Sequence, residues 1–427
     1  MRNSGKRKIS TGTIVVLTSA VLVLVLTAFV WTRLSSGKNV DLSRLRAGAI
    51  DLREIGGKTE EIPSAPSVEK AARPSAAETE KPVSSQQDRS FTLTAGGTVA
   101  LDGEVRKNSW YSDAKQYDYY DTMISLKREL QSDLNIVFLE NLLSEDGRSS
   151  DLMATNAAAS MLKGAGFNLA ACGFSKAFDK DTAGIRTTRK LLTEYGITPV
   201  GIYESNDENH YQIRDINGIQ TAILMYTGTI SSATRKNMAK AQTSGLVPAA
   251  DADIIAADIA EVRGLGCEAV IVLMNWGKTG KAPDKAMHTL AQKTADAGAD
   301  LIIGNGSRIV SGAEMLTAEG TGRQVLCVWS LGTVLSGDRS NIRRMAGMLL
   351  QVTVRADRGG TEMCDFRYIP LYTWKYKQDS RFYYRCLPAD EVVPDGMDTE
   401  QQKMMKKAAD TIRNAMKDTP VGERSFE

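Results

Sequence analysis

The stretch DAGADLIIGNGSRIVSGAE, residues 296–314, has the pattern of a helix end, a buried strand and a Gly/Asn/Ser loop. A strand that is apolar at nearly every position is typical of a parallel sheet covered on both faces. In such sheets, ligands bind at the loops that follow the carboxyl ends of the strands. This loop offers Asn305, Ser307 and Arg308, and no histidine, cysteine or carboxylate occurs before Glu314.

Similar strand and helix patterns alternate along the chain on both sides of this stretch. Strands separated by helices of about 10–15 residues favour crossover connections and largely parallel sheets. Three later segments alternate apolar and polar positions, which is typical of antiparallel, half-exposed strands. The sequence thus predicts an α/β fold with mixed sheets. Its buried strands are predicted at 134–141, 167–174, 221–228, 268–276, 299–306 and 324–332, and its alternating strands at 348–360, 361–376 and 381–389.

The two ends of the chain differ from this central body. Residues 1–12 form a basic tail, and residues 14–31 are an uncharged apolar run long enough to cross a membrane core of about 30 Å as a helix. We predict a transmembrane signal-anchor over 13–32; a cleaved signal peptide is the alternative, although its apolar core is usually only about 7–15 residues. Residues 33–90 have the polar composition of a disordered linker. Residues 396–427 predict a C-terminal amphipathic helix and tail.

The basic residues before the apolar run favour a cytoplasmic N-terminus. The prediction is therefore a single-pass protein of the cell membrane whose body lies at the cell surface. Total charge is nearly balanced, with 53 basic and 51 acidic residues, and gives no indication of nucleic-acid binding. Cys364 and Cys386 fall in two late strands that could pair, and outside the cell they could form a disulfide worth about 3 kcal/mol.

Six motifs together resemble the CapA family, the capsule or poly-γ-glutamate biosynthesis proteins with a calcineurin-like metallophosphoesterase fold. The motifs are TAGG (94–97), DLNIVFLEN (133–141), AGFNLAACGFSKAFDKDTAGI (165–185), LMNWGKTG (273–280), GADLIIGNGSRIVSGAE (298–314) and WSLGTVL (329–335). The resemblance implies a layered sandwich of mixed sheets flanked by helices, and we expect this CapA-like extracellular domain over 91–395.

The departures from the family pattern fall on the positions that the resemblance assigns to metal ligands. The first aspartate is replaced by Gly97, the Asn-His pair by Ser175-Lys176, and the histidine of His-Trp-Gly by Asn275, with Trp276 kept. The histidine loop reads Asn305-Gly306-Ser307-Arg308, the last asparagine is Thr333, and an asparagine before Leu-Glu is Phe138. Only Glu140 and Asp179 remain unchanged. We therefore predict no metal and no other cofactor, and a degenerate, metallophosphoesterase-like site.

The predicted cleft contains Glu140, Ser175, Lys176, Asp179, Asn275, Trp276, Asn305, Ser307 and Arg308. Glu140, Asp179 and Asn275 are the surviving catalytic candidates, although the favoured interpretation of the two carboxylates is that each orients a loop by accepting backbone hydrogen bonds. Lys176 and Arg308 could attract an anion, or be solvated or paired with Glu140 or Asp179. The two histidines, His210 and His288, are expected in solvent.

Two functions from different classes follow. The first is a membrane-anchored pseudoenzyme that assists capsule, poly-γ-glutamate or other surface-polymer biosynthesis or export, and that binds an anionic polymer or membrane-bound synthase and export components. The alternative is a divergent metallophosphoesterase-like hydrolase with a reduced metal site.

Overall fold

The computed structural model describes residues 89–147, 149–243, 245–357, 360–390 and 393–425, all within one compact unit, Pro82–Glu427. The predicted basic tail and anchor, and the predicted linker up to residue 88, lie outside these residues. Among the described residues, none of the helices is long and apolar enough to span a membrane.

The first sheet has nine strands and combines a parallel half with an antiparallel half. Strands β1, β4, β7 and β8 run parallel, and β16, β17 and β18 continue the sheet antiparallel from β1. The order is β18 (Arg381–Pro388), β17 (Gly360–Gln378), β16 (Ala346–Asp357), β1 (Arg89–Val99), β4 (Leu134–Leu139), β7 (Leu169–Ala171) and β8 (Thr198–Val200), with β15 (Thr333–Leu335) beside β1 and β19 (Gly422–Glu423) beside β17.

The second sheet has six strands, of which the central four are parallel. Their apolar side chains are buried at nearly every position, as the sequence pattern predicts. The order is β13 (Ala313–Thr317), β14 (Gln324–Val328), β12 (Leu301–Asn305), β11 (Ala269–Asn275), β10 (Ile219–Thr227) and β9 (Tyr211–Ile216), with β13 and β9 antiparallel to their neighbours. Two short pairs are separate: β2 (Trp110–Tyr111) with β3 (Gln116–Tyr117), and β5 (Leu142–Ser144) with β6 (Met153–Thr155).

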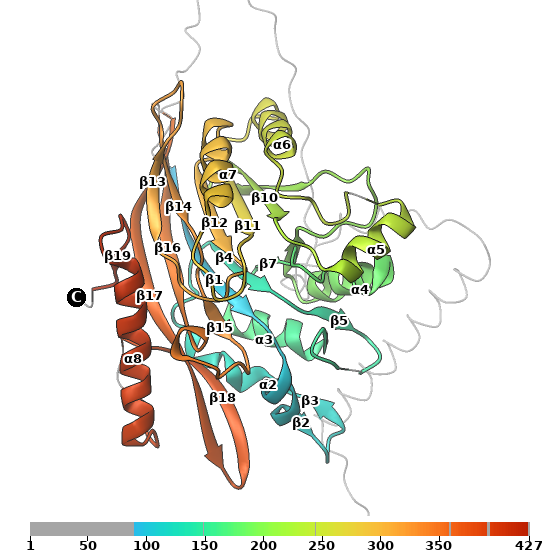
Figure 1. The fold of residues 1–427 in the computed structure, drawn as a ribbon, viewed down its shortest axis with the longest axis vertical. Helices are drawn as coiled ribbons and strands as arrows, with labels where there is room; N and C mark the ends of the chain where they lie inside the picture. The colour runs from blue at the N-terminus through green and yellow to red at the C-terminus, as the bar shows by residue number, and fades with distance from the viewer. Residues whose placement is uncertain (1–88, 148, 244, 358–359, 391–392, 426–427) are drawn as a thin grey trace, which may run out of the picture. The chain divides into compact units, whose positions relative to one another are not determined.

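Helices cover the outer faces of both sheets, so that the body is layered helix–sheet–sheet–helix (Figure 1). The central cluster joins both sheets through side chains such as Ile136 and Leu273. The first sheet is covered by α2 (Gly103–Asn108), α3 (Ala157–Ala165), α4 (Asp181–Glu194) and the short 3₁₀ turns η2 (Tyr120–Thr122) and η3 (Ile124–Leu126). The second is covered by α6 (Ala252–Gly264) and α7 (Lys285–Asp296).

Three further elements complete the described chain: α5 (Ser232–Ala241), η4 (Ile342–Arg344) and α8 (Thr399–Met416). Helix α8 runs alongside β17 at the left of Figure 1, and Met405 and Ile412 of its apolar face join the central cluster. It starts with a capping box in which Asp398 and Gln401 each bind the other's backbone N–H. The helix predicted in the C-terminal segment therefore forms and docks on the sheet.

The predicted disulfide between Cys364 and Cys386 is wrong. Both cysteines lie on adjacent antiparallel strands, but Cys386 pairs with Thr373 of β17, nine positions from Cys364. At about 3.3 Å per residue this offset is about 30 Å along the strand, whereas a disulfide needs Cα atoms within about 7 Å. Both thiols are free, and burial raises the pKa of each.

Candidate functional site

The carboxyl ends of four parallel strands, two from each sheet, hold six of the nine residues of the predicted cleft. Gly97 and Thr98 end β1, and Glu140 follows β4 directly. In the other sheet, Asn275 at the end of β11 is the register partner of Asn305 at the end of β12. Loops at such strand ends are where ligands bind in open α/β sheets, which is why these residues are considered together.

Glu140 and Arg308 form an ion pair that joins the two sheets at this edge. The Arg308 guanidinium donates to Glu140 Oε2 from Nη2 at 2.6 Å and from Nε at 2.9 Å, and Thr98 donates its hydroxyl to Glu140 Oε1 at 2.9 Å. The Glu140 side chain is 12% exposed and that of Arg308 is 21% exposed. Both carboxylate oxygens of Glu140 are therefore already bound within the protein.

Asp102 adds a second acidic partner on the far side of the same guanidinium. Its Oδ2 lies 3.5 Å from Arg308 Nη1, and its Oδ1 accepts the Gly337 backbone N–H at 2.8 Å. Burial lowers the pKa of Arg308, but the charges and hydrogen bonds of Glu140 and Asp102 outweigh it and raise that pKa overall. The guanidinium thus stays charged and is electrostatically balanced.

Thr333 supports the unusual backbone of Arg308. Arg308 has a φ of 57°, in the left-handed region that residues with a side chain rarely adopt. The Thr333 hydroxyl donates to the Arg308 carbonyl at 3.0 Å and holds the loop in this conformation. Two departures from the family pattern, at 308 and 333, therefore act together.

Asn305 is fully buried and is held by its neighbours on other strands. Its amide lies 2.8 Å from the Thr98 hydroxyl and 3.1 Å from the Ser330 hydroxyl. With its oxygen turned toward Thr98, the amide also accepts the Thr98 backbone N–H at 2.9 Å and donates to the Gly332 carbonyl at 3.3 Å. Asn305 is therefore a structural link between β12, β1 and the segment after β14.

Trp276 and Ser307 are also buried and satisfied within the protein. The indole N–H of Trp276 donates to the Trp329 carbonyl at 3.0 Å, and the Ser307 hydroxyl donates to the Ile309 carbonyl at 3.1 Å. Trp276 and Ser307 thus fix the loops that follow β11 and β12. The N–H of the indole and the O–H of the serine are both used within the protein.

Two former ligand positions have no room for a side chain. A Cβ on Gly97 would lie 2.3 Å from the Gly332 carbonyl oxygen, and one on Gly306 would lie 2.6 Å from the Trp276 carbonyl oxygen. Gly306 also has a φ of 103°, which disfavours any other residue. The backbone of neighbouring loops therefore occupies the space where the resemblance implies a carboxylate and an imidazole.

The residues present do not fit the metal centre that the resemblance implies. The part of the chain that the structure describes contains no group of three or more His, Cys, Asp or Glu side chains arranged to hold an ion. Glu140 is the one acidic ligand retained at these strand ends, and a guanidinium covers it. A fixed positive charge beside the carboxylate repels a metal cation.

Asp179, Ser175 and Lys176 belong to a different contact. Asp179 Oδ1 accepts the hydroxyls of Ser231 at 2.7 Å and Thr234 at 2.6 Å, at the start of α5. The Ser175 carbonyl accepts the Ser231 N–H at 2.7 Å. Lys176 is exposed. Asp179 therefore holds the start of α5 through two side-chain hydroxyls, a contact compatible with a loop-orienting role. Anion binding by Lys176 and Arg308 stays a prediction, and the charge of Arg308 is already balanced by Glu140 and Asp102.

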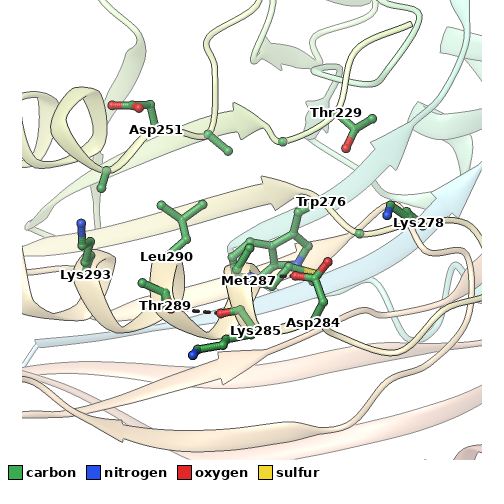
Figure 2. A pocket seen from close by; sticks show the side chains of 15 residues that line it. Thr229, Asp251, Trp276, Lys278, Asp284, Lys285, Met287, Thr289, Leu290 and Lys293 are labelled. Atoms are coloured by element: carbon green, nitrogen blue, oxygen red, sulfur yellow. Dashed lines mark hydrogen bonds between the residues drawn. The ribbon is translucent and has the colours of Figure 1, made fainter.

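A pocket of about 780 Å³ adjoins Trp276 at the ends of β10 and β11 (Figure 2). The start of α6 and residues 285–293 of α7 form its walls, and Thr229 and Asp251 lie across it from Thr289 and Leu290. The carboxylate of Asp251 accepts the backbone N–H groups of Asp253 and Ile254 in α6, and that of Asp284 accepts the N–H of Met287 in α7. The lysines of the lining, Lys278, Lys285 and Lys293, are exposed.

Sequence reasoning missed the residues that complete these contacts: Thr98, Asp102, Ser231, Thr234 and Ser330. Small hydroxyl side chains are common in every loop, and nothing in their spacing separates these from the others. Asp102 gave the one usable signal, because it follows the end of β1 by three residues, near the expected ligand position.

Comparisons with known proteins bear on family and fold. The model of the bacterial capsule synthesis protein family PGA_cap matches residues 92–338, more than half of the chain. No curated protein matches the sequence.

Two solved structures are similar at low identity. A novel phosphatase from Mycoplasma pneumoniae is 13% identical with a TM-score of 0.38, covering 66% of this chain and 94% of its own. The calcineurin-like phosphoesterase YfkN from Bacillus subtilis is 10% identical with a TM-score of 0.38, covering 77% of this chain and 99% of its own. At these TM-scores the two structures add nothing to the family match.

Proposed function

Because the chain belongs to the bacterial capsule synthesis protein family, we propose that it is a non-catalytic accessory in the production or export of a surface polymer. The observation that carries this proposal is the Arg308–Glu140 ion pair at the meeting strand ends. A two-metal hydrolase needs open carboxylate and imidazole ligands around cations about 3.5–4 Å apart. In this chain the Arg308 guanidinium binds the Glu140 carboxylate in place of a metal ion, and we infer that this ion pair has a structural role.

The proposal includes binding of an anionic polymer or of a protein partner. The pocket beside Trp276 supports the polymer, since its three lysines are exposed while its two aspartates cap helices. Ammonium groups attract carboxylates or phosphates without requiring a fixed geometry. The proposal also keeps the membrane anchor, the cytoplasmic N-terminus and the surface location that residues 1–32 predict.

The divergent-hydrolase alternative has no comparable support. It needs Glu140, Asp179, Asn275 and Asn305 to share one cation. Glu140 is bound by Arg308, and Asp179 is bound by the first residues of α5.

The test is the metal content and the activity of the full-length chain, purified after growth with manganese, zinc and iron present. Elemental analysis and hydrolysis of a phosphodiester such as bis(p-nitrophenyl) phosphate are measured together. We expect no stoichiometric metal and no chelator-sensitive hydrolysis. The variant Arg308→His, which restores an imidazole, should behave in the same way, because Gly97 and Gly306 leave no space for further ligands.

The matched control is Lys278→His, which places an imidazole on an exposed loop outside the strand-end contacts and reports adventitious metal binding. About one or two metals per wild-type chain, with hydrolysis abolished by a chelator, would overturn the proposal and establish the hydrolase.

A further inference from the structure

A second groove, of about 480 Å³, lies on the outer side of the first sheet, between the β2–β3 hairpin and α3. The hairpin is at the opposite end of the body from α6 and α7 (Figure 1). Four aromatic side chains line the groove: Trp110, Tyr117, Tyr120 and Tyr195. Trp110 is 39% exposed and Tyr120 is 46% exposed, although large apolar side chains at this exposure are few among the described residues.

The hairpin rings are held rigidly rather than left loose on the surface. Trp110 and Tyr117 are register partners whose ring centres lie 5.0 Å apart, and Tyr117 stacks on the buried Tyr119 at 5.9 Å. Arg381 of β18 secures the same strand, because its guanidinium donates to the Trp110 carbonyl at 2.6 Å and lies 4.1 Å from the ring centre of Tyr111. A preformed aromatic surface loses little conformational entropy when it binds a ligand.

Tyr120 is fixed against α3 in a second way. A Cβ on Gly164 would lie 2.9 Å from its ring, so the ring rests directly on the helix backbone. The Tyr120 backbone N–H donates to Asp118 Oδ1 at 2.8 Å. Aromatic faces therefore border the groove from both the hairpin and the helix side.

The polar side chains of the groove are uncharged and available. Gln116, Asn156 and Ser160 are exposed, and the structure gives their side chains no hydrogen bond to any other described residue. Asn156 stands at the N-cap of α3 without capping it, although asparagine at this position usually does. Asn156 and Ser160 are four residues apart and so share one face of the helix.

This composition matches the surface of a neutral sugar. The C–H groups on one face of a pyranose carry a slight positive charge and pack on the negative face of an aromatic ring. Its ring hydroxyls both donate and accept hydrogen bonds, as amides and hydroxyls do. A polyanion would call for several basic groups, but the lining contains only Lys115, with the carboxylate of Asp118 nearby.

We propose that the groove between the β2–β3 hairpin and α3 binds a neutral pyranose chain, with Trp110 and Tyr120 as stacking platforms and Gln116, Asn156 and Ser160 as hydrogen-bonding groups. This site is separate from the strand-end contacts and from the lysine pocket, and it does not depend on the function proposed above.

The test uses the purified full-length chain in a detergent without a sugar headgroup, since such a headgroup would compete for the groove. Cellohexaose and chitohexaose are titrated, with calorimetry and tryptophan fluorescence as readouts. Trp110 is the exposed tryptophan among the described residues, because Trp276, Trp329 and Trp374 are buried. We expect saturable binding that shifts the fluorescence. Trp110→Ala should weaken binding about five- to tenfold, and Trp110→Phe should retain it by calorimetry while losing the fluorescence change.

The control variant is Phe382→Ala, which removes an equally exposed aromatic side chain, 39% exposed, outside the groove. It should bind as the wild type does. Binding of both saccharides points to the pyranose face that they share, and binding of chitohexaose alone points to an acetamido-sugar chain; either supports the proposal. It is overturned if neither saccharide binds, if Trp110→Ala binds as the wild type, if Phe382→Ala binds as weakly as Trp110→Ala, or if poly-γ-glutamate binds in a Trp110-dependent way.

Discussion

Arg308 and Glu140 compensate each other's charge where both side chains are largely removed from water. Arg308→Met leaves the Glu140 carboxylate without its counter-ion, which should lower the free energy of unfolding by about 2–4 kcal/mol after allowance for partial exposure. The double variant Arg308→Met/Glu140→Gln should regain part of this loss, because the Glu140 charge is gone, while Asp102 still lacks the guanidinium but keeps its bond from the Gly337 N–H. Urea denaturation of the single and double variants measures the coupling free energy.

The matched control for this cycle is Arg355→Met, which breaks the pair of Arg355 with Asp365. Those side chains are 56% and 50% exposed, so its loss should stay below about 1 kcal/mol. An Arg308→Met variant that loses no more stability than Arg355→Met would show that the strand-end ion pair has no special structural role.

Strands with long apolar runs, and the alternating late strands, could be predicted from the sequence, whereas the two edge strands of the second sheet could not. The strands β4, β10, β11, β12 and β14 follow the predicted segments because burial on both faces leaves an unmistakable pattern. β9 and β13 lie at sheet edges, have mixed burial, and were missed. α5 was also missed, since it buries only Thr234 and so lacks an apolar stripe.

Contacts between distant elements of the candidate site could not be predicted from the sequence. The sequence placed Glu140 and Arg308 at neighbouring strand ends, but it left open whether they pair with each other, because 168 residues separate them. The register between β17 and β18 places Cys364 and Cys386 too far apart for a disulfide. No sequence pattern specifies that register. The lack of space for a side chain at Gly97 results from the backbone of Gly332, which belongs to a loop far away in the sequence. It can be seen only in the three-dimensional structure.

Two elements from different sheets are also joined at their amino ends. Arg89 at the start of β1 binds Glu268, just before β11, through two bonds of 2.6 and 2.9 Å. The hydrogen bond from Arg89 lowers the pKa of Glu268 below its usual value. A lowered folded-state pKa stabilises the protein above the unfolded value, and this contribution is lost as the pH falls through the folded value.

We therefore expect Glu268→Gln to lose less unfolding free energy than the wild type when the pH falls from about 6 to about 3. Arg89→Gln should remove the same acid-dependent contribution, and the double variant should add nothing further. Urea denaturation across this pH range checks all three variants. Identical pH profiles for wild type and Glu268→Gln would mean that the pair does not link the sheets energetically.

Over the whole described body, the residues at the positions that the resemblance assigns to metal ligands make contacts within the protein. Glu140 follows a strand of the first sheet, and Arg308 follows a strand of the second. Their ion pair, the Asn305 contacts and the tight packing at Gly97 and Gly306 all connect loops that a metal centre would otherwise bridge. This explains how the body stays ordered at this edge through its own side chains.

Membrane attachment of the chain is predicted from residues 1–32. The apolar run at 14–31 follows a basic tail, so the full-length chain should stay in the membrane fraction after alkaline carbonate extraction. Arginine at both Leu22 and Val25 should release it, because each charge near the centre of the span costs about 2.5–3.5 kcal/mol of insertion free energy. Arginine at both Thr32 and Ser35, outside the run, is the matched control and should leave the chain bound. N-terminal sequencing decides the remaining alternative: a mature chain that begins after the apolar run would establish a cleaved signal peptide and remove the anchor from the proposed function.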